Sequence, residues 1–414
     1  MKPYENKTET EEVLILAVDT GEYDVEASVG ELRELIRSAG GEVRGVIVQK
    51  LPQRNLVCYI GSGKLGEAEL FCHNTEVDLA VCDDELTPTQ QRVLEAALHT
   101  RVIDRTMLIL DIFAARAKSN EGKLQVELAQ LKYMLPRLRG TGEALSRQGG
   151  GIGTRGPGET KLESDRRHIR SRIHTLEEQL KTMSLRRERQ RERRKKDGVP
   201  TAAIVGYTNA GKSTLLNTLT DAGVLTENKL FATLDPTSRA LRLPDGREIM
   251  LIDTVGFISR LPHFLVEAFH STLEEATSAD ILLLLCDASD EDCEEKLEIT
   301  KEIIKELSAE EKPLITVYNK CDIANSYLMP ASKNAVRISA LKNVGTDALL
   351  RAIAENLPEK TVRAELLLPF SMAGTAAKLH ETAQIYAEEY REDGIYLDVR
   401  LEQRALRALI AYKI

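Results

Sequence analysis

The residues with the clearest chemical potential form a G-x-x-x-x-G-K-[ST] pattern, namely Gly206, Tyr207, Thr208, Asn209, Ala210, Gly211, Lys212 and Ser213. An apolar run at 201–205 enters the pattern like a buried strand, and residues 214–219 leave it with helical spacing. In that context the glycines let backbone N–H groups converge on phosphate at a helix N-terminus. We expect Lys212 to reach the β- and γ-phosphates of a nucleotide and Ser213 to ligate Mg²⁺. A chance glycine turn before a helix is the alternative.

A second phosphate-recognition pattern, D-x-x-G, directly follows the strand pattern at 248–252. It consists of Asp253, Thr254, Val255 and Gly256. We expect Asp253 to hold Mg²⁺ through a water. The Gly256 N–H should contact the γ-phosphate and move when that phosphate leaves. D-x-x-G alone is a weak signal, but its place at a strand end downstream of a phosphate loop makes it a strong one.

The base is selected by an N-K-x-D pattern made of Asn319, Lys320, Cys321 and Asp322. The Asp322 carboxylate can accept two hydrogen bonds from N1–H and the exocyclic amine of guanine. Adenine cannot supply these donors, so it would leave buried polar groups unpaired. We expect the Lys320 stem to cover the ring, and the pocket to be completed by Ser339, Ala340 and Leu341. In this order the patterns resemble the translation-factor-related GTPases, which implies GTP as substrate and GDP as product.

The loop that closes over the nucleotide should lie between residues 225 and 237. Its central run is Phe231, Ala232, Thr233, Leu234 and Asp235, and we include all five in the nucleotide site. Thr233 is the threonine expected to close on Mg²⁺ and the γ-phosphate in the GTP state. Thr226 and Thr237 are rivals, and an ordinary exposed loop threonine is the alternative.

The residue after D-x-x-G is Phe257, where Ras-like enzymes carry a glutamine that orients the attacking water. Phenylalanine cannot do this, so we expect slow intrinsic hydrolysis that a partner or a cation accelerates. Asn209 matches an asparagine that helps to ligate K⁺ in potassium-activated relatives. The catalytic residues expected are therefore Lys212, Thr233, Gly256 and Asn209.

The elements that position these residues fall into four segments. Residues 13–106 alternate strand patterns (13–18, 43–48, 77–82, 102–103) with helix patterns (29–39, 63–72, 88–98), which indicates a parallel α/β domain. The tail shows a strand at 364–368, a helix at 373–390 and a strand at 395–399. We therefore expect an α/β protein with an N-terminal α/β domain (1–110), a helical hairpin (111–197, tip about 140–160), a P-loop GTPase domain (198–358) and a small α+β domain (359–414).

Two heptad-patterned segments predict the hairpin. Leucines at 124, 128, 131, 135 and 138 form one apolar seam, and apolar residues at 169, 173, 176, 180 and 183 form the other. The glycine-rich tip and the end of the second helix carry the candidate RNA contacts Arg139, Arg147, Arg155, Arg186, Arg187, Arg193 and Arg194. A flexible linker at the tip and a solvated basic helix end are the alternatives.

Composition limits the remaining possibilities. The 414 residues carry a net charge of −9, which argues against a protein that coats nucleic acid with its whole surface, and we expect no DNA contact. The start of the chain has no apolar secretory segment, and the apolar run at 281–286 is too short to span a bilayer. Six cysteines without a CxxC pair indicate free thiols and no zinc site. We expect a cytoplasmic monomer, with the membrane periphery as a second location.

The combination of these motifs resembles the HflX family of the Obg–HflX group. The similarity covers residues 13–357 and rests on four stretches: Tyr-Ile-Gly-Ser-Gly-Lys at 59–64, Gly-Gly-Gly-Ile-Gly-Thr-Arg-Gly-Pro-Gly-Glu at 149–159, Phe-Ala-Thr-Leu-Asp at 231–235 and Asp-Thr-Val-Gly-Phe at 253–257. It implies a GTPase that binds the large ribosomal subunit and its rRNA, with the N-terminal domain and glycine-rich loop near the peptidyl-transferase region. It also implies that the protein splits or rescues stalled ribosomes under stress. A GTPase of ribosome assembly or tRNA modification, and a docking module gated by GTP binding alone, are alternatives.

The family has also been credited with an adenine-nucleotide activity of its N-terminal domain. Here residues 61–64, Gly-Ser-Gly-Lys, bear only a loose likeness to a phosphate loop. We expect this stretch to begin a helix instead.

Overall fold

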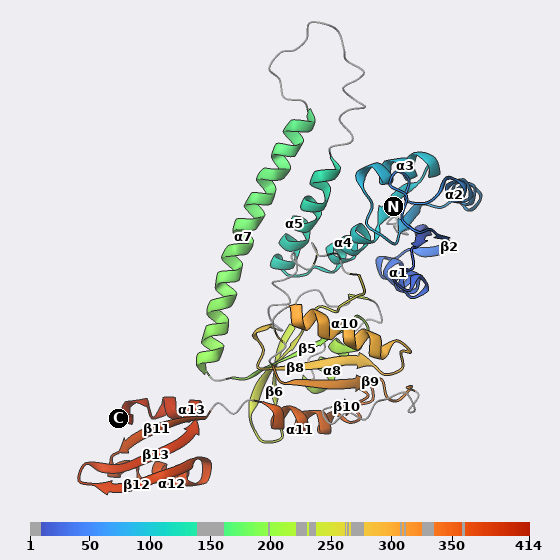
Figure 1. The fold of residues 1–414 in the computed structure, drawn as a ribbon. Coiled ribbons are helices and arrows are strands. Elements are labelled where there is room, and N and C mark those ends of the chain that lie inside the picture. Colours follow the sequence, from blue (N-terminus) through green and yellow to red (C-terminus); the bar gives the residue numbers. More distant parts are fainter. Residues whose placement is uncertain are drawn as a thin grey trace, which may run out of the picture.

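The first domain is built around a strand that is buried on both faces. In the computed structural model, β1 (Glu12–Asp19) lies inside a parallel sheet of order β2-β1-β3-β4. Figure 1 draws this domain in blue. Residues 13–18 of β1 are all buried, because helices cover both faces. The other strands are β2 (Glu42–Lys50), β3 (Leu79–Cys82) and β4 (Arg101–Asp104). Residues of α1 (Val25–Ala39) and α4 (Arg105–Arg116) complete one core, and residues of α2 (Ser62–Thr75) and α3 (Pro88–Leu98) complete the other.

Local capping explains where these helices begin and end. The Asp24 side chain accepts hydrogen bonds from the backbone of Glu26 and Ala27 at the start of α1, which ends at Gly40 in the left-handed region. A Thr87–Gln90 capping box begins α3. The strands and helices predicted for this domain are confirmed. The structure describes residues 10–138, 161–197, 199–220, 230–231, 237–260, 262, 265, 277–306, 309, 312–324, 335–357 and 361–414.

A pair of helices forms the stalk that rises from the molecule in Figure 1. Helix α5 (Asn120–Arg137) runs beside the 37-residue helix α7 (Lys161–Asp197), and Leu176 of α7 is fully buried. Ion pairs join Lys132 to Glu177 at 2.7 Å and Glu121 to Arg187 at 2.9 Å, which sets the two helices antiparallel. The predicted pairing of the two helices is confirmed, and the predicted glycine-rich tip lies outside the described residues.

The predicted boundary between the first domain and the stalk, after residue 110, falls inside α4. Residues Leu108, Ile109, Ile112 and Phe113 of that helix are buried in the same core as β1 and α1. Because α4 directly follows β4 and packs against α1, it belongs to the first domain, whereas α5 pairs with α7 and begins the stalk.

The third domain carries a six-stranded sheet of order β10-β9-β8-β5-β7-β6, in which only β6 runs antiparallel to its neighbour. Its strands are β5 (Thr201–Gly206), β6 (Thr237–Arg242), β7 (Glu248–Asp253), β8 (Ile281–Asp287), β9 (Leu314–Asn319) and β10 (Ala335–Arg337). The helices are α8 (Lys212–Thr220), α10 (Cys293–Glu306) and α11 (Thr346–Asn356). In parallel sheets of this kind, ligands bind at the carboxyl ends of the strands. The loop that follows the central strand β5 lies at that edge of the sheet.

The small C-terminal domain corrects one prediction. A helix was expected over 373–390, but α12 (Ala373–Thr382) ends there and residues 384–391 form strand β12 (Gln384–Arg391). The sheet order is β11-β13-β12, with β11 (Thr361–Leu368) and β13 (Gly394–Glu402), followed by α13 (Gln403–Ala408). Short 3₁₀ turns lie at Phe370–Met372 and Ile410–Tyr412. The turn at Gly394, with φ of 153°, brings β12 alongside β13, and its charged side chains then lie on an exposed edge strand.

Among the described residues, no helix combines the length and apolar character that crossing a bilayer requires.

Candidate active site

Two glycines give the phosphate loop its shape at the end of β5. Gly206 has φ of 155°, and a Cβ there would lie 2.1 Å from the carbonyl oxygen of Leu285. Gly211 has φ of 94°, and a Cβ there would lie 2.2 Å from Nδ2 of Asn319. Only glycine fits either position. The Asn319 amide also donates to the Ala210 carbonyl at 2.8 Å, so the structure joins the phosphate loop to the predicted base-recognition motif.

Lys212 is buried at the start of α8, beside the D-x-x-G motif. Its Nζ donates to the carbonyls of Gly206 at 3.1 Å and Tyr207 at 2.7 Å. A Cβ added at Gly256 would lie only 2.8 Å from this Nζ, so the two γ-phosphate-binding elements meet. Burial lowers the pKa of Lys212 to about 8, although nearby Asp253 opposes that shift. The ammonium group therefore lacks the compensating charge that a phosphate would supply.

The predicted Mg²⁺ ligands are in direct contact. The Ser213 hydroxyl donates to the Asp253 carboxylate at 2.7 Å, and Asp253 is fully buried at the end of β7. A hydroxyl and a carboxylate oxygen are hard donors that suit Mg²⁺, so this pair fits the ion. Thr254 is also buried and donates to the Ile204 carbonyl at 2.7 Å, while Val255 packs in the apolar cluster that includes α1 and α4. The side chains of Thr254 and Val255 therefore hold the D-x-x-G motif in place and do not line the nucleotide site.

The base-recognition residues converge at the ends of β9 and β10. The side-chain Oδ1 of Asn319 accepts from the backbone N–H of Ala340 at 2.9 Å, and Lys320 forms an ion pair with Asp287 at 2.6 Å. Hydrogen bonds from Ser339 and from Lys342, which lies 3.2 Å away, lower the pKa of Asp322. The carboxylate is thus ionised at neutral pH, as guanine recognition requires. The remaining predicted residues contribute differently: Cys321 donates its thiol to the Tyr318 carbonyl, and the Leu341 side chain is exposed.

Only part of the loop expected to close over the nucleotide is described by the structure. Ala232, Thr233, Leu234, Asp235 and the rival Thr226 lie outside the described residues, and the other rival, Thr237, begins β6. Phe231 is described, and its ring stands edge-on to that of Phe113 in α4, with centroids 4.6 Å apart. The backbone N–H of Leu230 donates to Ser38 at 3.0 Å. The structure therefore places Phe231 in an apolar contact with the N-terminal domain, a role that its position in the sequence does not reveal.

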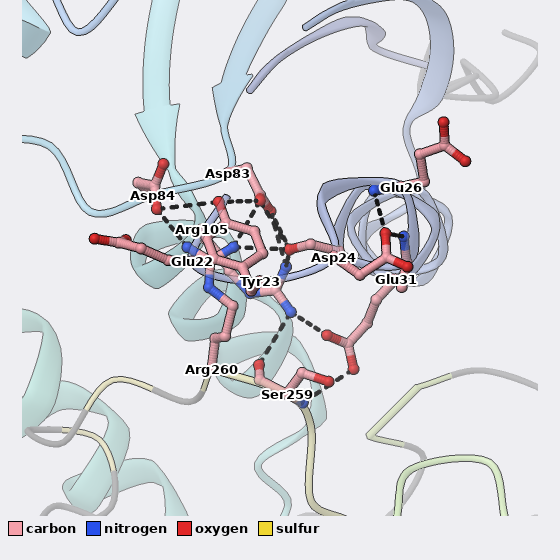
Figure 2. A network of polar contacts seen from close by, with 12 residues as sticks. Glu22, Tyr23, Asp24, Glu26, Glu31, Asp83, Asp84, Arg105, Ser259 and Arg260 are labelled. Atoms are coloured by element: carbon pink, nitrogen blue, oxygen red, sulfur yellow. Dashed lines mark hydrogen bonds and ion pairs between the residues drawn. The ribbon is translucent and has the colours of Figure 1, made fainter. Parts of the chain in front are cut away.

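A polar network that sequence reasoning missed joins the segment after D-x-x-G to the N-terminal domain (Figure 2). Arg260 donates to Asp83 at 2.7 Å and to Ser28 at 2.8 Å, and it also contacts Asp84. Its guanidinium lies 3.7 Å from the centre of the Tyr23 ring. All four partners belong to the first domain, so Arg260 is an interdomain anchor.

Neighbouring groups extend this network to the phosphate loop. The Tyr207 hydroxyl donates to Glu31 at 2.7 Å, and the Ser259 N–H donates to the same carboxylate at 3.2 Å. Arg105 donates to Asp83 at 3.0 Å and to the Ser259 carbonyl at 3.1 Å (Figure 2). One sequence feature could have indicated this network, namely Asp83 and Asp84 directly after β3. Two carboxylates at the end of a buried strand need cationic partners.

Few of the candidate RNA contacts can be placed. Arg186 and Arg193 are exposed on α7, whereas Arg187 is paired with Glu121. Arg139, Arg147 and Arg155 lie outside the described residues, and for Arg194 only the helical backbone is described.

The glycine-lysine stretch of the first domain begins a helix, as predicted. Gly61 precedes α2 and donates its N–H to Gln49 at 2.7 Å, and Lys64 pairs with Glu67 at 2.5 Å within the first turns. Both polar groups are therefore used locally.

Comparison with known proteins agrees with this geometry. Three family models match the chain, described as GTP-binding GTPase N-terminal (residues 26–114), GTP-binding GTPase Middle Region (116–194) and 50S ribosome-binding GTPase (201–320). The GTPase HflX of Caldanaerobacter subterraneus subsp. tengcongensis is 52% identical over 386 residues, which cover 93% of this chain and 90% of the relative. The GTPase HflX of Escherichia coli is 41% identical over 396 residues, which cover 94% and 93%.

A solved structure is also similar, that of a GTP-binding protein from Sulfolobus solfataricus in complex with GDP. It is 27% identical, has a TM-score of 0.45, and the match covers 84% of this chain and 98% of that one. None of these matches supports a location at the membrane periphery. The two curated relatives each cover more than 90% of this chain at 41% identity or more, and the protein is therefore a GTP-hydrolysing enzyme that belongs to the HflX family.

Proposed function

We propose that this GTPase binds the large (50S) ribosomal subunit and its rRNA, as a monomer in the cytoplasm, and splits or rescues stalled 70S ribosomes under stress. The observation that carries the proposal is the polar network between the G domain and the N-terminal domain. Ser259 and Arg260 follow Gly256 closely and reach Glu31 and Asp83. Because loss of a γ-phosphate moves the segment around such a glycine, the nucleotide state can reposition the whole N-terminal domain.

The N-terminal domain is in turn fixed to the stalk. The Tyr133 hydroxyl of α5 donates to buried Asp104, and Arg137 donates to Asp104 at 3.2 Å and to the Leu86 carbonyl at 2.8 Å. A movement that begins at Gly256 would therefore reach α5. The exposed Arg186 and Arg193 of α7 supply positive charge for phosphate contacts on rRNA.

The residues of the G domain divide the chemistry among themselves. Lys212 would neutralise charge on the β- and γ-phosphates, and the Gly256 N–H would contact the γ-phosphate. Ser213, Thr233 and Asp253 would hold Mg²⁺, which supplies further neutralisation of the phosphate charge when bound. Asn209 would help to ligate K⁺. GTP turnover should then rise when K⁺ replaces Na⁺, and equal rates in the two salts would exclude a role for potassium.

The test is sucrose-gradient sedimentation of purified 70S ribosomes with the full-length protein and either GTP or a non-hydrolysable GTP analogue. We expect the 70S peak to shrink and the protein to sediment with 50S subunits. A protein with Asp322→Asn, whose affinity for GTP should be much weaker, is the matched control and should leave the 70S peak intact at a GTP concentration that saturates only the wild-type protein. Absence of co-sedimentation with any ribosomal particle would refute the proposal.

A second candidate is a docking module in which GTP binding does the work and hydrolysis only resets the protein. Phe257 favours it, because its side chain is buried and its backbone pairs with Gly206 and Thr208, so it cannot orient a water. Single-round splitting assays distinguish the two. Full splitting with the non-hydrolysable analogue supports the docking module, whereas splitting only with GTP excludes it.

A further inference from the structure

Two cysteines of the G domain lie against each other beside the phosphate loop. Cys286 is near the end of β8, and Cys293 is the first residue of α10. Both side chains line the same cavity, and both are free thiols. Both are buried in the core cluster that also contains Tyr207 and Phe257. We propose that Cys286 and Cys293 form a reversible disulfide in response to a peroxide, and that this disulfide weakens guanine-nucleotide binding.

A cavity gives a small oxidant access to the pair. It measures about 50 Å³ and is lined by both thiols, by Thr208 and Asn209 of the phosphate loop, and by Lys296 of α10. A single water needs roughly 10–15 Å³ of such space, so hydrogen peroxide fits. The Thr208 hydroxyl is buried and has no hydrogen-bond partner among the described residues, which leaves a polar group to receive a small polar molecule.

The two thiols differ in how readily they form a thiolate, which is the species that a peroxide oxidises. The hydrogen bond from Cys286 lowers the pKa of Cys293, against the opposing effects of burial and of nearby Glu294, Asp290 and Asp287. The position of Cys293 at a helix N-terminus also favours its thiolate. The same hydrogen bond, followed by burial, raises the pKa of Cys286. Because Cys293 begins α10, where the helix N-terminus favours a thiolate, we assign it as the attacking sulfur and Cys286 as the resolving sulfur.

The chemistry balances with one peroxide. The Cys293 thiolate attacks one peroxide oxygen, the O–O bond breaks, and the products are a sulfenic acid and hydroxide, which is protonated to water. The Cys286 sulfur then attacks the sulfenic sulfur, the S–S bond forms, and hydroxide leaves with the thiol proton as a second water. The two sulfurs lose two electrons in total, and the peroxide gains them. A dithiol reductant reverses the process by thiol–disulfide exchange.

A link between these residues would act on the nucleotide through the turn that separates them. Asp287, the last residue of β8, lies directly before that turn and forms the ion pair with Lys320 at 2.6 Å. The next residue, Ala288, donates its backbone N–H to the backbone carbonyl of Asn319 at 2.8 Å. Drawing the ends of the turn together would displace these partners of the base-recognition motif. Because the Asp287–Lys320 pair is only partly buried, we expect GDP affinity to fall about threefold to fivefold, the effect of losing one such pair.

The full-length protein is exposed to hydrogen peroxide, its remaining thiols are alkylated, and its peptides are mapped by mass spectrometry. We expect a peptide that joins Cys286 to Cys293 and disappears after dithiothreitol treatment. Cys72 and Cys82, whose pKa values are raised chiefly by burial in the N-terminal domain, should stay reduced. A peptide map without a Cys286–Cys293 link would overturn the proposal. The experiment uses the wild-type protein, so its outcome does not depend on whether a variant folds.

GDP affinity is then measured on reduced, oxidised and re-reduced protein. The oxidised form should bind GDP about threefold to fivefold more weakly, as expected for one partly buried ion pair, and re-reduction should restore binding. Cys286→Ser and Cys293→Ser should each remove the response to peroxide, whereas the matched control Cys58→Ser, in the N-terminal domain, should retain it. Equal affinity of the reduced and linked forms, or a peroxide response that survives in Cys293→Ser, would refute the proposed control.

Discussion

Replacing Arg260 with alanine should loosen the N-terminal domain from the G domain by a measurable amount. Removing one partner of a buried ion pair costs about 3–5 kcal/mol when the other charge is left alone. Here Asp83 keeps Arg105 at 3.0 Å, and Asp84 keeps Arg54 at 2.9 Å and the Tyr59 hydroxyl at 2.8 Å. Each carboxylate therefore loses one partner of several, and we expect a smaller loss of about 2 kcal/mol, typical of charge-assisted hydrogen bonds.

That loss corresponds to about a thirtyfold increase in the fraction of molecules whose interface is open, since each 1.4 kcal/mol is about tenfold. Hydrogen exchange measures it directly, because the Ser259 N–H donates to Glu31 across the interface at 3.2 Å. The Ser259 amide should exchange about thirtyfold faster in Arg260→Ala than in the wild-type protein. Arg242→Ala, which removes an exposed arginine of β6, is the matched control and should leave the rate unchanged. An unchanged rate in Arg260→Ala would refute the view that this network holds the domains together.

Three further predictions concern the nucleotide site. Asp322→Asn should lower GTP affinity by about 100-fold or more while xanthine nucleotide binds better, because the amide cannot accept from both guanine donors; equal affinities in titration would contradict this. In the nucleotide-free protein the pKa of Lys212 is about 8, and a bound phosphate should raise this pKa. Above pH 8 binding therefore requires the uptake of a proton, and nucleotide affinity should fall by up to about tenfold per pH unit. Titrations from pH 7 to 10 that show no proton uptake would exclude that origin. Gly256→Ala places a Cβ 2.8 Å from Lys212 Nζ, so single-turnover GTP hydrolysis should be lost while GDP affinity stays within a few-fold; a normal rate would contradict the assignment.

Local sequence was sufficient wherever backbone chemistry determines geometry. The phosphate loop could be predicted because Gly206 and Gly211 adopt conformations that other residues avoid, and their spacing is visible in one short stretch. The same holds for α3, whose capping box and proline mark its start. The strand at 384–391 could not be predicted in this way, because pairing with β13 outweighs a sequence that also suits a helix.

The contacts between domains also escaped prediction, for a related reason. Phe231 stands in a loop motif that suggests nucleotide contact, yet its ring packs against Phe113, which lies far away in the sequence. Likewise, no sequence pattern around Arg260 predicts which residues it contacts. Only the tertiary arrangement brings Asp83 and Asp84 to it.

The length of α7 has a mechanical consequence. Its 37 residues form a rod about 55 Å long at 1.5 Å per residue, and its lower end leads directly to β5, which carries the phosphate loop. A rigid rod converts rotation at its base into translation at its far end in proportion to its length. A tilt of about 5° would displace the upper end by about 5 Å, given that length. Small adjustments around a nucleotide at the base of α7 would thereby become displacements of several ångströms at the far end of the stalk.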